Sequence, residues 1–146
     1  MTLLDANLLL YAFIDTFEQH KASRRWLEEQ LAERVEVGLG WQVITAFIRI
    51  GTNARLFTVP MSLKQVEDAL NKLLLQSNVK IVVPTDRHWR IFLRLLQETN
   101  ATANLVMDVH LAALTIEHNA ELATTDGDFA RFKGLSYFNP LDTIQS

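Results

Sequence analysis

The apolar residues of this chain follow two spacings, and each spacing predicts a different kind of element. Short, nearly continuous apolar runs predict buried strands. These runs occupy residues 2–5, 35–39, 79–83, 120–125 and 135–138. Between them, apolar residues recur every three or four positions, which predicts helices. The helical stretches are residues 6–14, 20–34, 41–57, 62–74, a stretch that begins at Pro84, residues 105–118, and a turn with a short helix over 126–132.

The order of these elements predicts the fold class. Strands alternate with helices from one end of the chain to the other, which is typical of a parallel sheet with helices on both faces. We therefore expect an α/β fold, a three-layer α/β/α sandwich around a central, mainly parallel sheet of four or five strands. The clearest helix start is a capping box formed by Ser62 and Gln65, and Pro60 ends the helix before it.

Length and composition bound the organisation. A chain of 146 residues, 49% apolar and 21% charged, is typical of a soluble globular protein, so residues 1–146 are expected to form a single domain. The absence of cysteine excludes disulfides, thiolate nucleophiles and sulfur-ligated metals. No apolar run approaches the roughly 18 residues of a membrane-spanning helix, so a cytoplasmic protein is the default. The net charge of −3 does not favour a general nucleic-acid coat protein.

Four aspartates stand at the boundaries of predicted buried elements. Asp5 closes the first strand, Asp108 lies in the first turn of a helix, and Asp126 and Asp128 follow the fourth strand. Because ligands bind beyond the carboxyl ends of parallel strands, these acids are expected to face one edge of the sheet. Two carboxylates at about 4 Å repel each other by about 4 kcal/mol near a protein surface. Oxygen ligands that need neutralisation point to a hard divalent cation, Mg²⁺ or Mn²⁺.

Local structure offers another explanation for the single aspartates. Aspartate is favoured in the first turn of a helix, and Asp126 with Asp128 also fits a turn with a helix cap. Asp5 resists this explanation, because a carboxylate between the apolar segments "TLL" and "ANLLL" needs a buried partner.

The histidines and the basic side chains are interpreted more simply. His20, His88, His110 and His118 lack metal-ligand spacing, and we expect them to be satisfied core or surface residues. Basic residues gather on two helices and form either a rim that contacts phosphate or, more simply, solvated faces beside glutamates. These residues are Lys21, Arg24, Arg25, Arg87, Arg90 and Arg94.

Four segments resemble the conserved blocks of a known family. They read "LLDANLLLYA" (3–12), "WQVITAFIRIGTN" (41–53), "NLVMDVHLAALTIEH" (104–118) and "ATTDGDF" (123–129). In order and spacing they resemble PIN domains, and the chain looks most like VapC-type ribonuclease toxins of bacterial toxin–antitoxin pairs. The resemblance covers nearly the whole chain. It implies a PIN-like fold, Mg²⁺-dependent endoribonuclease activity at an acidic pocket, and neutralisation by a cognate antitoxin.

The resemblance also assigns roles to residues. Asp5, Asp108 and Asp126 match the acids that hold the cation and carry catalysis, and Asp128 would be an accessory ligand. The further pocket residues expected to contact phosphate or orient ligands are Asn7, Arg49, Thr52, Asn104 and Thr125. Water would attack phosphorus in line, without a covalent enzyme intermediate. The chain departs from the family at Ala46, where the common pattern has a glutamate, and this bears on whether a second ion binds.

Other functions fit parts of the pattern. With Ala46 in place of glutamate, the chain could be a catalytically weak or inactive PIN-like module that binds RNA or protein. A phosphatase with Asp5 as nucleophile ranks last, because Asn7 stands where that class requires a second aspartate. Exposed apolar residues, such as those of the leucine run 73–75, would serve an antitoxin groove or a homodimer, unless neighbouring helices cover them.

Overall fold

The structure of the protein is a computed structural model, and residues 1–142 of it are described. Its centre is a five-stranded sheet in the order β3-β2-β1-β4-β5, and every strand pair is parallel. The strands are β1 (Thr2–Leu4), β2 (Val37–Gly40), β3 (Val79–Val82), β4 (Glu121–Ala123) and β5 (Tyr137–Phe138). The predicted α/β class is confirmed, and the sheet is entirely rather than mainly parallel.

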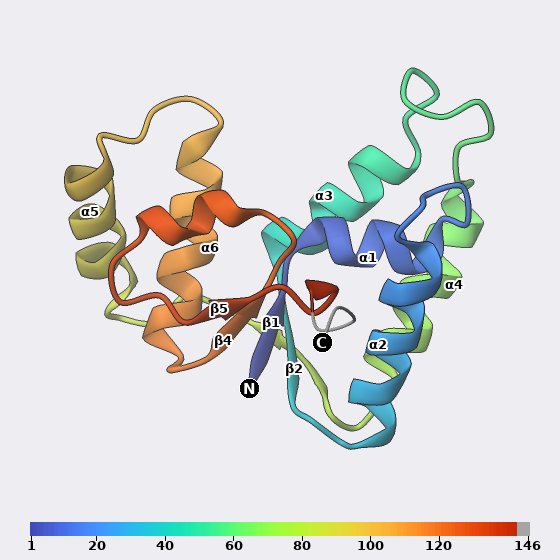
Figure 1. The fold of residues 1–146 in the computed structure, drawn as a ribbon, viewed down its shortest axis with the longest axis horizontal. Helices are drawn as coiled ribbons and strands as arrows, with labels where there is room; N and C mark the ends of the chain where they lie inside the picture. Colours follow the sequence, from blue (N-terminus) through green and yellow to red (C-terminus); the bar gives the residue numbers. More distant parts are fainter. Residues whose placement is uncertain (143–146) are drawn as a thin grey trace.

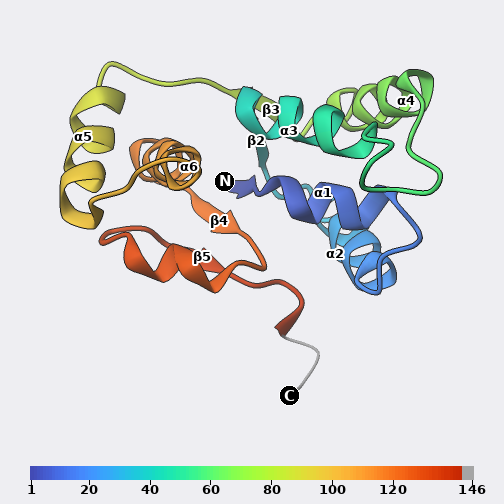
Figure 2. The same ribbon diagram turned by 90° about the horizontal axis from the view of Figure 1, so that it is seen from above.

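Six α-helices and one short 3₁₀ helix connect the strands. They are α1 (Ala6–Phe13), α2 (His20–Ala32), α3 (Trp41–Gly51), α4 (Leu63–Leu74), α5 (His88–Thr99), α6 (Leu105–Glu117) and the 3₁₀ helix η1 (Gly127–Arg131). Figure 1 shows the sheet between two groups of helices. Seen from above, α5 and α6 lie on one side of the sheet, and α1 to α4 lie on the other (Figure 2). This is the predicted three-layer arrangement.

The first strand lies at the centre of the sheet and of the core. All three residues of β1 are buried, and β4 beside it carries the fully buried Leu122. Close packing continues into β2, where a Cβ on Gly38 would lie 2.7 Å from a methyl carbon of Val82, so only glycine fits there without a shift. Because the carboxyl ends of parallel strands share one edge, the residues that follow β1 and β4 must emerge side by side.

Helix boundaries depart from the predictions where the backbone finds other partners. The helix predicted over 41–57 ends at Gly51, where the Thr52 hydroxyl donates to the carbonyl of Ile48 and closes the last turn. The helix predicted from Pro84 begins at His88, after a turn in which the Thr85 N–H donates to the buried carboxylate of Glu117 and the Thr85 hydroxyl accepts from the Arg87 N–H. All other elements match their predicted bounds within two residues at each end.

Two further predictions concern α4 and the end of the chain. The capping box is present: the Ser62 hydroxyl accepts from the Gln65 N–H, and the Gln65 side chain accepts from the Ser62 N–H. The leucine run divides, since Leu73 is buried whereas Leu75 is 82% exposed, so neighbouring helices cover only part of it. Residues 143–146 of the predicted single domain lie outside the described residues. Within residues 1–142, no helix is long and apolar enough to cross a membrane.

Candidate active site

Asp5 is fixed at the carboxyl end of the central strand. Its N–H donates to the carbonyl of Ala123 (3.0 Å), which extends the pairing of β1 with β4 by one residue. The hydroxyl of Thr124 donates to Asp5 Oδ2 at 2.7 Å. Strand pairing therefore selects both the position of the acid and the partner that its partly buried carboxylate requires.

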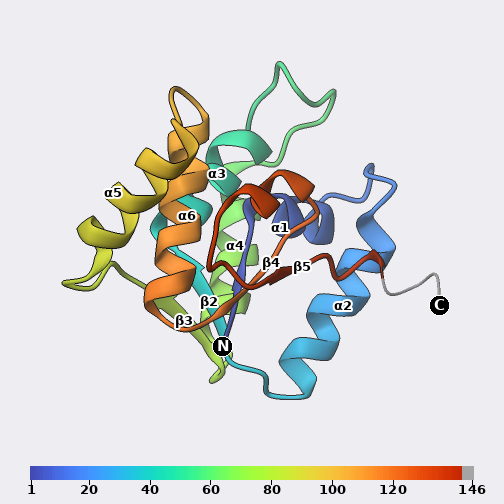
Figure 3. The same cartoon turned by 60° about the vertical axis from the view of Figure 1, so that its left-hand side comes forward.

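Asp126 and Asp128 are joined to the same edge by a chain of hydrogen bonds. The Asp126 N–H donates to the Thr124 hydroxyl (3.0 Å), and the Asp128 N–H donates to Asp126 Oδ1 (2.8 Å). Asp126 thus caps η1, as the local explanation of these acids proposed. The cap also connects the acids to Thr124, so the turn and the site are one structure. Figure 3 shows η1 near the end of the sheet where α1 begins.

Asp108 approaches from α6 and lies within the electric field of the other acids. Its pKa is raised from 3.8 to about 6, first by burial and then by the charges of Asp5, Asp126 and Asp128. The charge of Arg131 opposes this rise. Since the proton affinity of one acid responds to three others, all four carboxylates belong to a single electrostatic cluster.

Asp5 has the same character in a more buried position. Burial raises its pKa, and the charge of Asp126 adds to the rise. Hydrogen bonds from Thr124 and from the backbone N–H of Ala6 oppose it without cancelling it. A carboxylate whose ionised form is disfavoured in this way gains most from a positive charge placed beside it.

The donor set of this cluster fits a hard divalent cation. Carboxylate oxygens supply the ligands, and the basic side chain near them, Arg131, donates from Nε to the Asp128 carbonyl and lies 3.7 Å from its carboxylate. Among residues 1–142, no three His, Asp or Glu side chains already surround a common point at coordination distance. The agreement with a divalent cation therefore rests on the type of ligand and on the excess negative charge. For all the acids to coordinate one ion, their side chains must move closer together around it.

Three residues near the acids escaped the sequence analysis. Thr124 bonds to both Asp5 and Asp126, whereas the predicted Thr125 makes no such bond; only the strand register distinguishes the two threonines. Arg131 was identifiable from its position three residues after Asp128. Gln42 links α3 to α6, since its amide donates to the carbonyl of Met107, the neighbour of Asp108. Arg131 thus places one basic side chain beside the acids.

The other predicted pocket residues separate into two groups. Asn7 is exposed in the first turn of α1, and Asn104 is exposed directly before α6, so both lie next to helices that carry or follow an acid. Arg49 and Thr52 lie at the opposite end of α3 from its start at the sheet. Within the described residues, neither bonds to the four acids, and the Thr52 hydroxyl is used by its own helix. The half-buried Ala46 lies in the middle of α3.

All four histidines have hydrogen-bond partners, as predicted, and two of them share a network with Glu117. His88 Nδ1 donates to the buried Glu117 carboxylate at 3.0 Å, and His88 Nε2 lies 3.1 Å from His110 Nδ1. Burial and the neighbouring His88 lower the pKa of His110. His20 and His118 each donate to a backbone carbonyl. These contacts give each of the four histidines a hydrogen-bond partner within the described residues.

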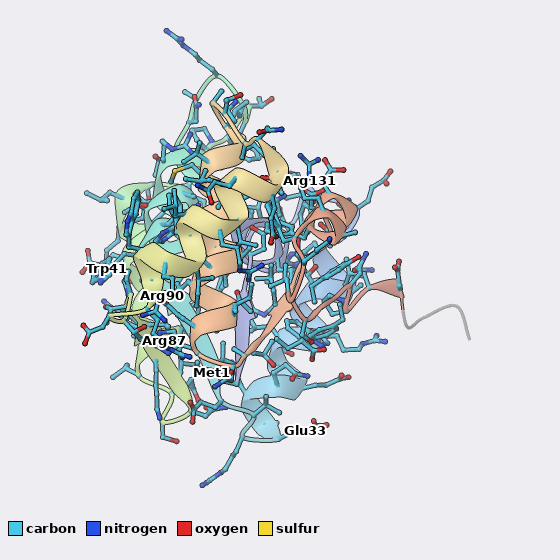
Figure 4. All side chains as sticks on the ribbon, turned by 90° about the vertical axis from the view of Figure 1, so that its left-hand side faces the viewer. Met1, Glu33, Trp41, Arg87, Arg90 and Arg131 are labelled. Carbon is cyan, nitrogen blue, oxygen red and sulfur yellow. The ribbon has the colours of Figure 1, made fainter. Side chains whose placement is uncertain are left out.

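The arginines of α5 do not adjoin the acids. Arg87 and Arg90 lie toward the end of the molecule that carries Met1, whereas Arg131 lies toward the opposite end (Figure 4). Arg87 donates to the carbonyl of Glu117, and Arg94 pairs with Glu98. The simpler interpretation of this face, a solvated and internally paired surface, agrees with these contacts.

A family model of the PIN domain matches residues 2–135. This chain belongs to the PIN-domain family. Among curated relatives of this PIN domain, ribonuclease VapC37 of Mycobacterium tuberculosis is 40% identical over 140 residues, covering 96% of this chain and 97% of the relative. Ribonuclease VapC33 of the same species is 36% identical over 141 residues, covering 97% of this chain and 99% of the relative.

Solved structures share the fold of this PIN domain at low sequence identity. VapBC2 of Rickettsia felis, bound to promoter DNA, superposes with a TM-score of 0.69 at 18% identity, covering 94% of this chain and 97% of that one. The sarcin–ricin loop cleaving toxin VapC20 of Mycobacterium tuberculosis superposes with a TM-score of 0.65 at 15% identity, covering 93% and 99%. At these identities the likeness establishes the fold alone.

Proposed function

We propose that this PIN domain is a divalent-cation-dependent endoribonuclease of the toxin type, which hydrolyses RNA phosphodiester bonds. The observation that carries the proposal is the convergence of four acids at one sheet edge, where hydrogen bonds through Thr124 join Asp5, Asp126 and Asp128. Asp108 faces them from α6, and their charges raise its pKa. Its support from outside the chain is the name ribonuclease borne by relatives that are 30–40% identical over almost the full length. The alternative of a phosphatase with Asp5 as nucleophile has no comparable support.

The chain's own residues divide the work at this site. Asp5, Asp108 and Asp126 would hold the cation, Mg²⁺ or Mn²⁺, with Asp128 beside them. When bound, such an ion neutralises a phosphate oxygen and lowers the pKa of a water. Thr124 holds Asp5 in one rotamer by its 2.7 Å hydrogen bond.

Two neighbours of these acids keep the site in shape. Gln42 holds the start of α6 and therefore the position of Asp108. Arg131, beside Asp128, offers positive charge to a phosphate that enters the acidic pocket.

The partners follow from the same proposal. We propose that a cognate antitoxin restrains the enzyme, as the VapBC complexes among the structural neighbours suggest by analogy, and that the toxin acts as a homodimer on cytoplasmic RNA. Exposed apolar side chains support such contacts, among them Trp41, Leu63 and Leu75, which are 55%, 70% and 82% exposed.

RNA cleavage with and without a divalent cation tests the proposed function. Purified protein is incubated with total RNA in Mg²⁺ or Mn²⁺ and in EDTA, beside the variants Asp5→Asn and Asp86→Asn. We expect cleavage only with the cation, a loss of at least 100-fold in Asp5→Asn, and full activity in Asp86→Asn, whose exposed acid lies outside the cluster.

Two results would contradict the proposal. If Asp5→Asn cleaved RNA as fast as wild type, the Asp5 carboxylate would have no part in the reaction. A folded wild-type protein that binds RNA and cuts none would instead favour the alternative suggested by Ala46, a catalytically inactive PIN-like module that binds RNA or protein.

A further inference from the structure

A polar pocket of about 270 Å³ adjoins the acids at the ends of β4 and β5. Its walls include Thr124, Thr125, Asp126, Tyr137, Asn139 and Asp142. We propose that this pocket binds one RNA base next to the phosphodiester that is cut, and that its polar groups select guanine. The inference rests on the proposed ribonuclease function and adds a specificity site to it.

The register of the sheet places the pocket beside the candidate cation ligands. β4 pairs with β1 on one side and with β5 on the other, with Leu4, Ala123 and Phe138 in one row. Asp5, Thr124 and Asn139 directly follow the ends of these strands, and the N–H groups of Asp5 and Thr124 continue the pairing by donating to the carbonyls of Ala123 and Phe138. Thr124 bonds to Asp5 and also lines the pocket. A nucleotide whose base enters this pocket therefore carries its phosphate toward the acids.

Tyr137 provides the apolar surface that a base requires. It belongs to β5, the last strand of the sheet, and is 38% exposed although it is a large aromatic residue. Tyr137 and Asn139 both line the pocket, whereas Phe138 between them packs against Trp26 of α2. Single-stranded RNA is read by proteins through bases that stack on aromatic rings while their edges form hydrogen bonds.

The polar groups of the pocket match the edge of guanine. Asn139 Oδ1 accepts from the Leu141 N–H at 2.9 Å, which leaves its NH₂ group as a donor. Asp142 is exposed and, among residues 1–142, forms no ion pair, so its carboxylate is free to accept. Guanine presents two adjacent N–H donors, which one carboxylate accepts together, and an O6 acceptor for the amide. Adenine, cytosine and uracil lack that pair of donors.

The charge of the pocket argues for a base rather than a phosphate as its occupant. Asp126 and Asp142 both line it, and two carboxylates repel a phosphate group. A neutral base with N–H donors instead gains hydrogen bonds to charged acceptors, which are stronger than those between neutral groups.

Nucleotide binding and cleavage-end mapping test this inference on the full chain. GMP, AMP, CMP and UMP are titrated by calorimetry, and the ends produced from a random-sequence RNA are sequenced. The variants are Asn139→Ala, Asp142→Asn and Tyr137→Ala, and the controls are Asn71→Ala, Asp86→Asn and Tyr137→Phe. We expect GMP to bind at least tenfold more tightly than the other three nucleotides, and cleavage ends to be enriched in guanine.

The variants separate a specificity site from a structural one. Each of the three is expected to weaken GMP binding at least tenfold and to flatten the guanine enrichment, while the rise in melting temperature on adding Mn²⁺ stays as in wild type. The three controls keep both preferences. Retained guanine preference in Asn139→Ala and Asp142→Asn would overturn the inference.

The outcomes also distinguish this inference from the proposed function. RNA cleavage with no preference for guanine, or equal binding of the four nucleotides, contradicts the base pocket and leaves the ribonuclease intact. Selective GMP binding by a protein that cuts no RNA with any divalent cation contradicts the ribonuclease and leaves the pocket.

Discussion

Replacing Asp108 with asparagine is expected to make the protein more stable and inactive at once. The fold raises the pKa of Asp108 from 3.8 to about 6, through burial and the charges of Asp5, Asp126 and Asp128. One pKa unit corresponds to about 1.4 kcal/mol, so the full effect is about 3 kcal/mol. Because Asp108 is only partly buried, screening by solvent reduces this to about 1–2 kcal/mol.

The expected stabilisation depends on pH. The folded protein holds the Asp108 proton more tightly than the unfolded chain, so the stability that this proton confers is complete below pH 3.8. It is lost as the pH rises through about 6. At pH 7.5 in EDTA, Asp108→Asn should therefore raise the free energy of unfolding by about 1–2 kcal/mol, and the melting temperature by about 4 °C. The difference should shrink toward pH 4.

Thermal unfolding followed by circular dichroism at pH 7.5, 6 and 4.5 measures this difference, with Asp86→Asn as the control. Adding Mn²⁺ should affect the two proteins differently. The melting temperature of wild type should rise because the cation binds the folded state, whereas that of Asp108→Asn should rise little or not at all. An Asp108→Asn variant that melts below wild type at pH 7.5 in EDTA would refute the reasoning, because the carboxylates would then not repel one another.

Two further substitutions test the support of the site and of the core. Thr124→Val removes the hydrogen bond to Asp5 and should cost about 1–3 kcal/mol of stability and at least tenfold in the rate of RNA cleavage. Thr124→Ser keeps the hydroxyl and should retain both stability and activity. Equal activity of the two variants would show that the Thr124 hydroxyl does not support the site. Leu73→Ala, at a buried position, should lower the free energy of unfolding in urea by about 2–5 kcal/mol. Leu75→Ala, at an 82% exposed position, should change it by no more than about 0.5 kcal/mol. Similar losses in the two variants would mean that the described packing of α4 is wrong.

The sequence predicted the layers of the fold because each layer has its own periodicity. Continuous apolar runs identified all five strands, and the capping box at Ser62 and Gln65 marked the start of α4 correctly. The boundaries were less accurate where a long-range contact competes with local preference. Before α5, the Thr85 N–H donates to the Glu117 carboxylate of α6, and no local pattern around Pro84 predicts that contact.

The acids of the candidate site could be predicted from the sequence, but the residues that hold them in place could not. The acids follow strands and open helices, so their common edge follows from the α/β order alone. Which of two adjacent threonines bonds to Asp5 depends on the pairing of β1 with β4, a contact across 119 residues. The effect of Arg131 on Asp108 likewise requires η1 to fold back over the edge of the sheet.

Anomalous diffraction from crystals soaked in Mn²⁺ tests the central claim most directly. We predict one strong peak at the carboxyl edge of the sheet, coordinated directly or through one water by Asp5, Asp108 and Asp126. A peak held by other residues, or none at this edge in a protein that cleaves RNA, would contradict the account.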